Sequence, residues 1–473
     1  MTEKRGFLGS IIGFSVSSWI GFILGIISVP VLTSLLKPSQ YAIINQFNAA
    51  SLFFMSLFTI GMDSGFVRFF FEPPSGFRRE QVLGNSLYYS TAILIVFSLI
   101  CIPFYSELSG LLFGIKSWQI CLLFFFAVLS QIFIRFFTTN YRLLNSILAF
   151  TIISIALQLI TKFSLLIALP FHGSDFSLLF AFTLGIFLLA GVTFIVNFSS
   201  RSFSWSSVPL IKNREFMKYS LGSWLVPMVI YANTYFSQII IRHFAGENTL
   251  GIYLSANVFA GILGVVQYGF TNYWSAYMFE NYNKNQDLIK KVHDYICFFS
   301  VAAMCAFIFA KDFLYLFIGS QYHASKSIFA LVISAPLFTL IGETTAYGIS
   351  IEKKAHVSLY SYIVFFFLNM ILSFILVPLY GMFGAALSLM ISGLVNLIVQ
   401  TFFGQKYYVT IENKFRTFLT ISAILSLSFL NYFFDEKLLP TIILTSGILI
   451  FIIVLYFKSL RSGIYLFRRS NQI

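Results

Sequence analysis

The chain has 473 residues, of which 58% are hydrophobic and only 10% are charged, and its mean hydropathy is +0.86. Soluble domains carry about 25% charged residues, so this composition excludes a soluble globular protein and predicts a membrane protein. Its spans are expected to be helices, because lipid offers no hydrogen-bond partner to exposed backbone groups. The net charge of +13 does not by itself indicate nucleic-acid binding, since in a membrane protein the position of basic residues matters more than their sum.

Fourteen apolar runs have about the 20 residues that a helix needs to cross a bilayer, or more. They cover residues 10–35, 42–66, 83–105, 118–139, 144–169, 176–198, 217–243, 250–278, 292–310, 328–350, 356–379, 382–404, 416–434 and 438–457. No small-residue cleavage site follows the first run, which is therefore expected to be retained. The predicted fold class is all-α, a polytopic membrane protein with about 14 transmembrane helices.

The basic residues indicate the orientation of these spans. With both termini in the cytoplasm, the inner segments hold 22 of the 30 Lys and Arg residues. The outer segments hold six: Lys37, Lys116, Arg242, Lys311, Lys326 and Lys437. Arg135 and Lys162 remain within spans. The asymmetry predicts cytoplasmic N- and C-termini.

Two similar stretches suggest that the chain has two halves. Tyr219–Trp224 (YSLGSW) opens the seventh span as Phe14–Trp19 (FSVSSW) opens the first. The match is either an internal repeat or a chance similarity between two helices that begin with small residues and a tryptophan. A repeat of six spans in one orientation predicts two parallel lobes with a site between them. The predicted domains are an N-terminal lobe at 1–210, a C-terminal lobe at 211–405, and two additional helices with a cytoplasmic tail at 406–473.

Three stretches carry a resemblance to a known family. Leu32–Phe47 followed by Ile60–Glu72 resembles the first helical pair of bacterial polysaccharide flippases of the multidrug/oligosaccharidyl-lipid/polysaccharide exporter superfamily. Gly251–Glu280 is similar to their eighth span, and Leu368–Gly393 to their eleventh and twelfth. The resemblance covers most of the chain, although each motif alone has low specificity.

The resemblance implies two six-helix lobes around a central cavity plus two extra C-terminal helices. It also implies a function: flipping undecaprenyl-pyrophosphate-linked oligosaccharide, an O-antigen or capsule repeat unit, across the bacterial cytoplasmic membrane. The same resemblance implies that transport occurs by alternating access and is coupled to an ion. It also implies three partners: the lipid bilayer, the polysaccharide polymerase and the chain-length machinery.

Small residues in two places have a structural interpretation. Pro378 is expected to stop the eleventh span, Gly381 to permit a tight reversal, and Gly384 to allow close contact between the two helices. In the eighth span, Gly261 and Gly264 share a face and are expected to allow close helix packing.

The fifth span carries a lysine on a polar stripe. Thr151, Ser154, Gln158 and Lys162 are spaced three, four and four residues apart and so share one helix face. Lysine near the bilayer centre costs about 2.5–3.5 kcal/mol on insertion scales, which favours an interior orientation toward a cavity. The alternative is that Lys162 snorkels to the outer interface.

Other spans supply further candidates for a cavity that binds an anionic head group. The substrate-binding candidates are Lys162, Gln158, Arg135, Arg142, Arg242, Tyr235 and Gln238. Arg135 and Arg142 belong to a stripe in the cytoplasmic half of the fourth span, where snorkelling to the cytoplasmic head groups is the alternative. Tyr235, Gln238 and Arg242 share a side of the seventh span, where interfacial anchoring is the ordinary explanation.

Two acidic residues are candidates for ion coupling. Glu343 lies in the cytoplasmic half of the tenth span, where it is either a coupling site or an internal counter-ion for a basic residue. Asp63, near the cytoplasmic end of the second span, is the second candidate, although a local pair with Arg68 is its simpler interpretation.

Two other functions remain as alternatives. A multidrug exporter of the same superfamily would need an anionic or apolar cavity, against which the intramembrane bases argue. A membrane-embedded glycan polymerase or ligase would need a large outer loop, and the sequence predicts none. No phosphate-cradling GxxxxGK[ST] motif, paired carboxylates or Cys/His cluster occurs, so the chain is predicted to be a transporter, not an enzyme, with no cofactor, no metal and no nucleic-acid partner.

Overall fold

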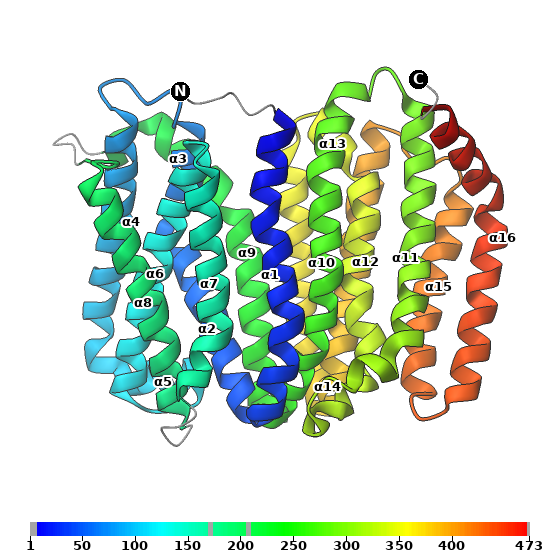
Figure 1. Ribbon diagram of the computed structural model, residues 1–473, viewed down its shortest axis with the longest axis horizontal. Coiled ribbons are helices and arrows are strands. Elements are labelled where there is room, and N and C mark those ends of the chain that lie inside the picture. The colour runs from blue at the N-terminus through cyan, green and yellow to red at the C-terminus, as the bar shows by residue number, and fades with distance from the viewer. Residues whose placement is uncertain (1–6, 169–173, 205–209, 471–473) are drawn as a thin grey trace. The chain divides into compact units, whose positions relative to one another are not determined.

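The computed structural model describes residues 7–168, 174–204 and 210–470, and these residues form helices and no strands. The elements are α1 (Phe7–Leu35), α2 (Pro38–Thr59), α3 (Met62–Arg68), α4 (Arg79–Cys101), η1 (Ile102–Phe104), α5 (Tyr105–Phe113), α6 (Trp118–Leu143), α7 (Ile147–Ala168), α8 (Asp175–Ser199), η3 (Leu210–Lys212), α9 (Arg214–Ala245), α10 (Glu247–Asn281), α11 (Gln286–Tyr315), η4 (Ser320–Lys326), α12 (Phe329–Thr345), α13 (Tyr347–Ile351), α14 (Ala355–Tyr407), α15 (Lys414–Phe433) and α16 (Leu438–Ser470). Within each of the two units described below, the long helices run side by side (Figure 1). The predicted all-α class is confirmed.

Each predicted span falls on helical residues. The second covers α2 and α3, the tenth covers α12 and α13, and α14 contains the eleventh and twelfth together. Within the described residues, ten helices are long and apolar enough to cross a membrane, or eleven if the bent pair η4 and α12 counts as one span. In this count α14, which contains two of the predicted spans, is one helix. The two ends of the chain, whose cytoplasmic location is predicted, lie outside the described residues.

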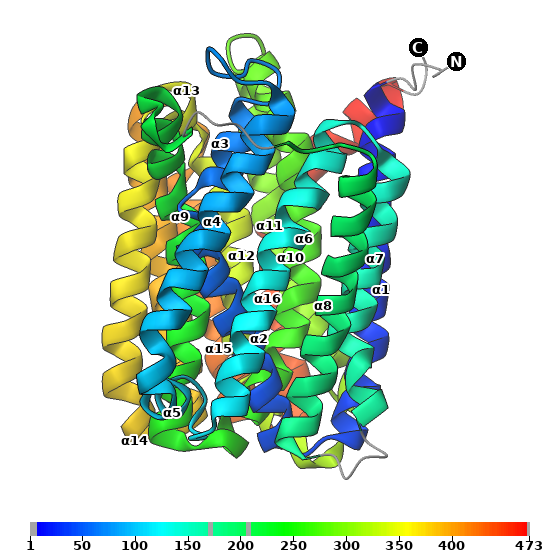
Figure 2. The same cartoon turned by 90° about the vertical axis from the view of Figure 1, so that its left-hand side faces the viewer.

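The helices form two compact units. Unit 1 consists of residues 1–32 and 40–239, and unit 2 consists of residues 33–39 and 240–473. In unit 1, α8 packs on both α6 and α7, and α4 packs on α6 (Figure 2). In unit 2, α12 is the central helix, because it contacts α10, α11, α14 and α15. Its residues from Phe329 to Ser334 are accordingly buried.

Helix α14 is a hairpin, as the Pro-x-x-Gly turn predicts. The hydroxyl of Ser361 donates to Asn396 Oδ1 over 2.5 Å, although residues 35 apart in one straight helix would be about 50 Å apart. The reversal occurs at Gly381, which has φ 56° and ψ −130°. A Cβ at Gly384 would lie 2.1 Å from the carbonyl oxygen of Leu376, so the absence of a side chain lets the two arms meet.

The second predicted span is broken, whereas the sequence indicated one continuous helix. Ile60 and Gly61 have φ angles of 47° and 69°, which end α2 and start the short helix α3. A positive φ is unusual for a β-branched residue and persists only where the surroundings hold it. The N-terminal part of α9 provides that support: the backbone oxygen of Ser220 lies 2.1 Å from the position of a Cβ on Gly61, and Trp224 Nε1 donates to the Ser56 oxygen over 2.7 Å.

Two further expectations need correction. A Cβ at Gly261 or Gly264 would meet no atom within 4 Å among the described residues, so this face of α10 is open and not closely packed. Lys311, expected in an outer loop, lies in α11 and is only 3% exposed. Its ammonium group donates to Asn431 Oδ1 over 3.0 Å and pairs with Asp435, which explains how the apolar run extends past a lysine.

Candidate functional site

Lys162 and Gln158 face two glycines of α1. A Cβ on Gly25 would lie 3.0 Å from Lys162 Nζ, and a Cβ on Gly21 would lie 2.5 Å from Gln158 Nε2. Both pairs advance by four residues, so α1 and α7 run parallel with glycines opposite the long polar side chains. The missing side chains of α1 provide the space that these two groups occupy.

The ammonium group of Lys162 lies well inside its helix. Side chains tilt toward the N-terminus of their helix, so the Lys162 side chain points away from Ala168, the nearer end of α7. It lies level with Gly25, which is about 15 Å from the end of α1 at a rise of 1.5 Å per residue. This geometry favours an interior position over snorkelling. The side chain is half-buried, and within the described residues it forms no ion pair.

Arg135 does have a carboxylate partner, which is Asp63. Its Nε and Nη2 lie 3.0 Å and 2.9 Å from Asp63 Oδ2. Arg68 instead pairs with Glu72 over 3.1 Å, so the expected local pair between Asp63 and Arg68 is wrong. The reason is the break at Ile60–Gly61, which sets α3 against α6 and directs its first turn toward Arg135.

The other candidates do not gather around these residues. Arg142 is exposed in the last turn of α6. Tyr235 is 1% exposed and stacks on Phe53 of α2, with ring centroids 5.7 Å apart, and Gln238 is buried one turn further along α9. Arg242 belongs to unit 2. Tyr235 and Gln238 therefore act in packing α9 within the described structure, and a role in substrate binding stays a prediction.

Glu343 lies in a polar group of unit 2. Gln267 Nε2 of α10 is 3.5 Å from Glu343 Oε1, and Thr271 is one turn further along the same helix. Glu343 forms no ion pair with any described residue, so the counter-ion interpretation finds no partner in this part of the chain.

A second polar cluster, which was not predicted from the sequence, joins α15 and α16 to α11. His293 is 0% exposed and hydrogen-bonds through its two ring nitrogens to Thr344 (2.7 Å) and Thr417 (2.9 Å). Beside it, Asp294 accepts from Ser459 (2.7 Å) and pairs with Arg416 (3.4 Å). The signal that could have revealed it is the pair of adjacent polar residues at the start of an apolar run.

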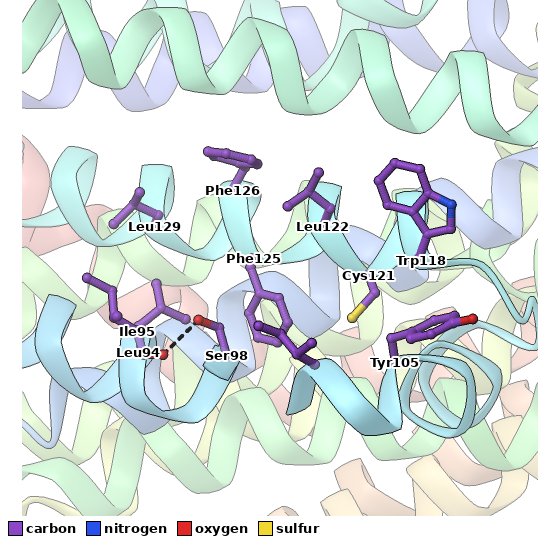
Figure 3. A pocket seen from close by; sticks show the side chains of 11 residues that line it. Leu94, Ile95, Ser98, Tyr105, Trp118, Cys121, Leu122, Phe125, Phe126 and Leu129 are labelled. Carbon is purple, nitrogen blue, oxygen red and sulfur yellow. Dashed lines mark hydrogen bonds between the residues drawn. The ribbon is translucent and has the colours of Figure 1, made fainter. Parts of the chain in front are cut away.

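A cavity of about 400 Å³ lies elsewhere in unit 1, between α4, α5 and α6 (Figure 3). Its lining is mostly leucine, isoleucine and aromatic side chains, and the Ser98 hydroxyl is already bonded to the Ile95 oxygen over 2.8 Å. Lys162 and Arg135 are not among the lining residues. This cavity suits an apolar group and offers nothing to an anion.

Comparisons with known proteins show which fold this is. No family model matches the chain, and no curated protein matches its sequence. Among solved structures, the lipid II flippase MurJ in an inward closed conformation is similar with a TM-score of 0.69 and 18% identity, over 94% of this chain and 99% of that one. An inward-facing multidrug resistance MATE family transporter of the MOP superfamily is similar with a TM-score of 0.57 and 17% identity, over 88% and 99%.

A third similar structure is a MOP superfamily transporter from Pyrococcus furiosus, described as having a binding pocket of reverse polarity. Its TM-score is 0.54 at 16% identity, over 88% of this chain and 96% of that one. At such identities a similarity establishes the fold, while function depends on the residues of the site. The chain has the fold of the MurJ flippase and the MATE transporters.

Proposed function

We propose that this chain flips an undecaprenyl-pyrophosphate-linked oligosaccharide across the bacterial cytoplasmic membrane by alternating access, for surface polysaccharide biosynthesis. The fold it shares with MurJ supports the general class of activity. The observation that carries the choice of an anionic substrate is Lys162, an ammonium group in a membrane-spanning helix without an ion-pair partner among the described residues.

The physical argument concerns charge. A pyrophosphate that leaves water loses hydration, and an unpaired cation inside the protein offsets part of that cost. The same anion lowers the cost of keeping Lys162 charged in a span. Arg135 supplies a planar guanidinium, which suits bidentate contacts with phosphate oxygens. Arg142, on the cytoplasmic side, and Arg242, on the outer side, remain proposed as further contacts of the substrate.

The test is complementation of a strain that lacks the gene. Lys162→Ala and Arg135→Ala should each lower surface glycan export about tenfold and cause lipid-linked oligosaccharide to accumulate, with protein levels unchanged. Lys116→Ala, which removes an exposed lysine outside the spans, is the matched control and should export normally. Full export by both intramembrane variants would contradict the proposed cationic site.

Glu343 is proposed as the ion-coupling residue. It is a carboxyl group within a span, next to Gln267 and without a basic partner in the described residues, so it can bind and release a cation without breaking an ion pair. Asp63 is the second candidate for ion coupling, but its contact with Arg135 suggests a different role for this residue.

Multidrug export is the second candidate function, and the similarity to MATE transporters is the observation that favours it. Such a protein would expel organic cations, which Lys162 and Arg135 would repel. Deletion of the gene should then sensitise cells to cationic drugs and leave surface glycan unchanged. The opposite pair of results supports the flippase, and the same deletion identifies the sugar by showing which lipid-linked oligosaccharide accumulates.

A further inference from the structure

We propose that Asp63 occupies the anion-binding edge of Arg135 when the site is empty, and that the pyrophosphate of the substrate displaces it. The inference rests on the proposed function and deepens it, because it assigns Asp63 the role of an internal competitor and not that of a coupling site. It concerns contacts within unit 1 only.

The geometry of the pair leaves the guanidinium partly unsatisfied. Nε of Arg135 donates to Asp63 Oδ2 over 3.0 Å, and Nη2 lies 2.9 Å from the same oxygen. A guanidinium has five N–H donors, so a single carboxylate oxygen engages only one of its edges. The Arg135 side chain is 47% exposed, whereas that of Asp63 is 13% exposed. A larger anion can therefore approach Arg135 from the open side.

Asp63 is held in place by the backbone on which it sits. It is the second residue of α3, which begins after the left-handed pair Ile60 and Gly61. Ser220 of α9 closes over this turn, because its side chain lies 2.1 Å from where a Cβ on Gly65 would be. Arg135, by contrast, has a long side chain that can turn about several bonds. The exchange thus moves the guanidinium and leaves the carboxylate where it is.

The exchange has a physical purpose in a membrane. An unpaired arginine inside a span is costly, and Asp63 reduces that cost while no substrate is present. A pyrophosphate brings more charge and more acceptor oxygens than one carboxylate, so it can replace Asp63 at the guanidinium. When the pyrophosphate leaves, Asp63 recaptures Arg135 and prevents a tightly bound state. Lys162 lacks such a competitor within the described residues.

The test measures binding of a prenyl pyrophosphate to the purified full-length protein, with the prenyl alcohol as the probe that lacks the anion. Asp63→Asn should lower the dissociation constant for the pyrophosphate about tenfold, since removal of a competing charged hydrogen bond corresponds to roughly that factor. The same variant should export glycan more slowly in cells, because release becomes slow. Glu72→Gln is the matched control: it frees Arg68 of the same short helix from its carboxylate and should change neither quantity.

The outcomes separate this inference from the proposed function. Wild-type binding of the pyrophosphate without any gain in Asp63→Asn would overturn the competitor role and leave the flippase standing. No pyrophosphate-dependent binding by either protein would overturn both. A purely structural pair between α3 and α6 predicts weaker binding in the variant, never tighter binding.

A measurement on the wild-type protein covers the case in which Asp63→Asn does not fold. Carbodiimide labelling followed by mass spectrometry should show that Asp63 becomes more reactive when the prenyl pyrophosphate is added, because its partner has left. The peptide containing Glu72 serves as the internal reference. Unchanged or lower labelling of Asp63 at saturating pyrophosphate would refute the exchange.

Discussion

Lys162 and Arg135 are both cations in membrane-spanning helices, yet their surroundings differ. Lys162 lies against glycines of α1 and has no ion pair in the described residues, whereas Arg135 forms an ion pair with Asp63. The helical spacing in the sequence places Gln158 and Lys162 on one face, and both side chains lie against glycines of α1. The spacing could not predict the partner of Asp63, because that partner depends on a backbone break at Ile60. An isoleucine does not indicate a positive φ, so the break cannot be predicted from the residue type.

A third intramembrane cation, Lys311, is satisfied in another way and leads to a prediction about stability. Its ammonium is 3% exposed and bound to Asp435 and Asn431. Lys311→Met should destabilise the protein by about 3 kcal/mol, the lower end for breaking a buried pair, because Asp435 is 21% exposed. Thermal unfolding of the purified protein measures the loss.

The controls for Lys311 come from the same region. Lys326→Met breaks the exposed pair with Asp312 and should cost less than about 1 kcal/mol. Adding Asp435→Asn to Lys311→Met should recover part of the loss, since it removes the uncompensated carboxylate. Equal losses for Lys311→Met and Lys326→Met would show that burial of the pair does not matter.

At the scale of elements, the hairpin in α14 shows local sequence acting as predicted. The glycine of the Pro-x-x-Gly pattern predicted the reversal, because only glycine readily adopts φ 56° with ψ −130°. Pro378, which was expected to stop the eleventh span, lies inside the helix, and the break comes at Gly381. The α10 glycines show the reverse: the same residue type at helical spacing indicated close packing, but no described atom approaches Gly261 or Gly264. A small residue permits contact and does not require it.

The hairpin gives a prediction that separates conformation from packing. Gly381→Ala should cost about 1–3 kcal/mol through backbone strain, and Gly384→Ala should cost a similar amount because its Cβ would lie 2.1 Å from the Leu376 oxygen. Gly393→Ala, whose Cβ would lie 3.6 Å from Ala335, should be neutral or slightly stabilising, since alanine favours helices. Thermal unfolding midpoints compare the three, and a stable Gly381→Ala variant would argue against the reversal at that residue.

At the scale of the whole molecule, helix directions agree with the predicted alternation. α1 and α7 run parallel, as the Gly21–Gln158 and Gly25–Lys162 contacts require. α11 and α15 are also parallel, because Asp294 meets Arg416 near their starts and Lys311 meets Asp435 near their ends. In a chain that crosses the membrane at every span, all odd-numbered spans point the same way. Spans one and five should therefore be parallel to each other, and so should spans nine and thirteen.

The orientation itself is a prediction that labelling can test. Lys116→Cys should react with a membrane-impermeant maleimide added to intact cells, and Lys284→Cys should react only after the cells are opened. Both positions are exposed and lie outside the long helices, so accessibility reports the side of the membrane and not burial. The reverse pattern would place the basic segments outside and refute the predicted topology.

The sequence alone determined that this is a helical membrane protein, where its spans lie, where α14 reverses, and which intramembrane cations need explaining. These properties follow from the length of apolar runs, from the backbone freedom of glycine and from the cost of charge in lipid, all of which act locally. Only the tertiary structure decided that Asp63 contacts Arg135, that glycines of α1 lie against Lys162, and that His293 and Lys311 join α11 to α15. Those contacts link residues more than 50 positions apart, and no local pattern encodes which helices will meet.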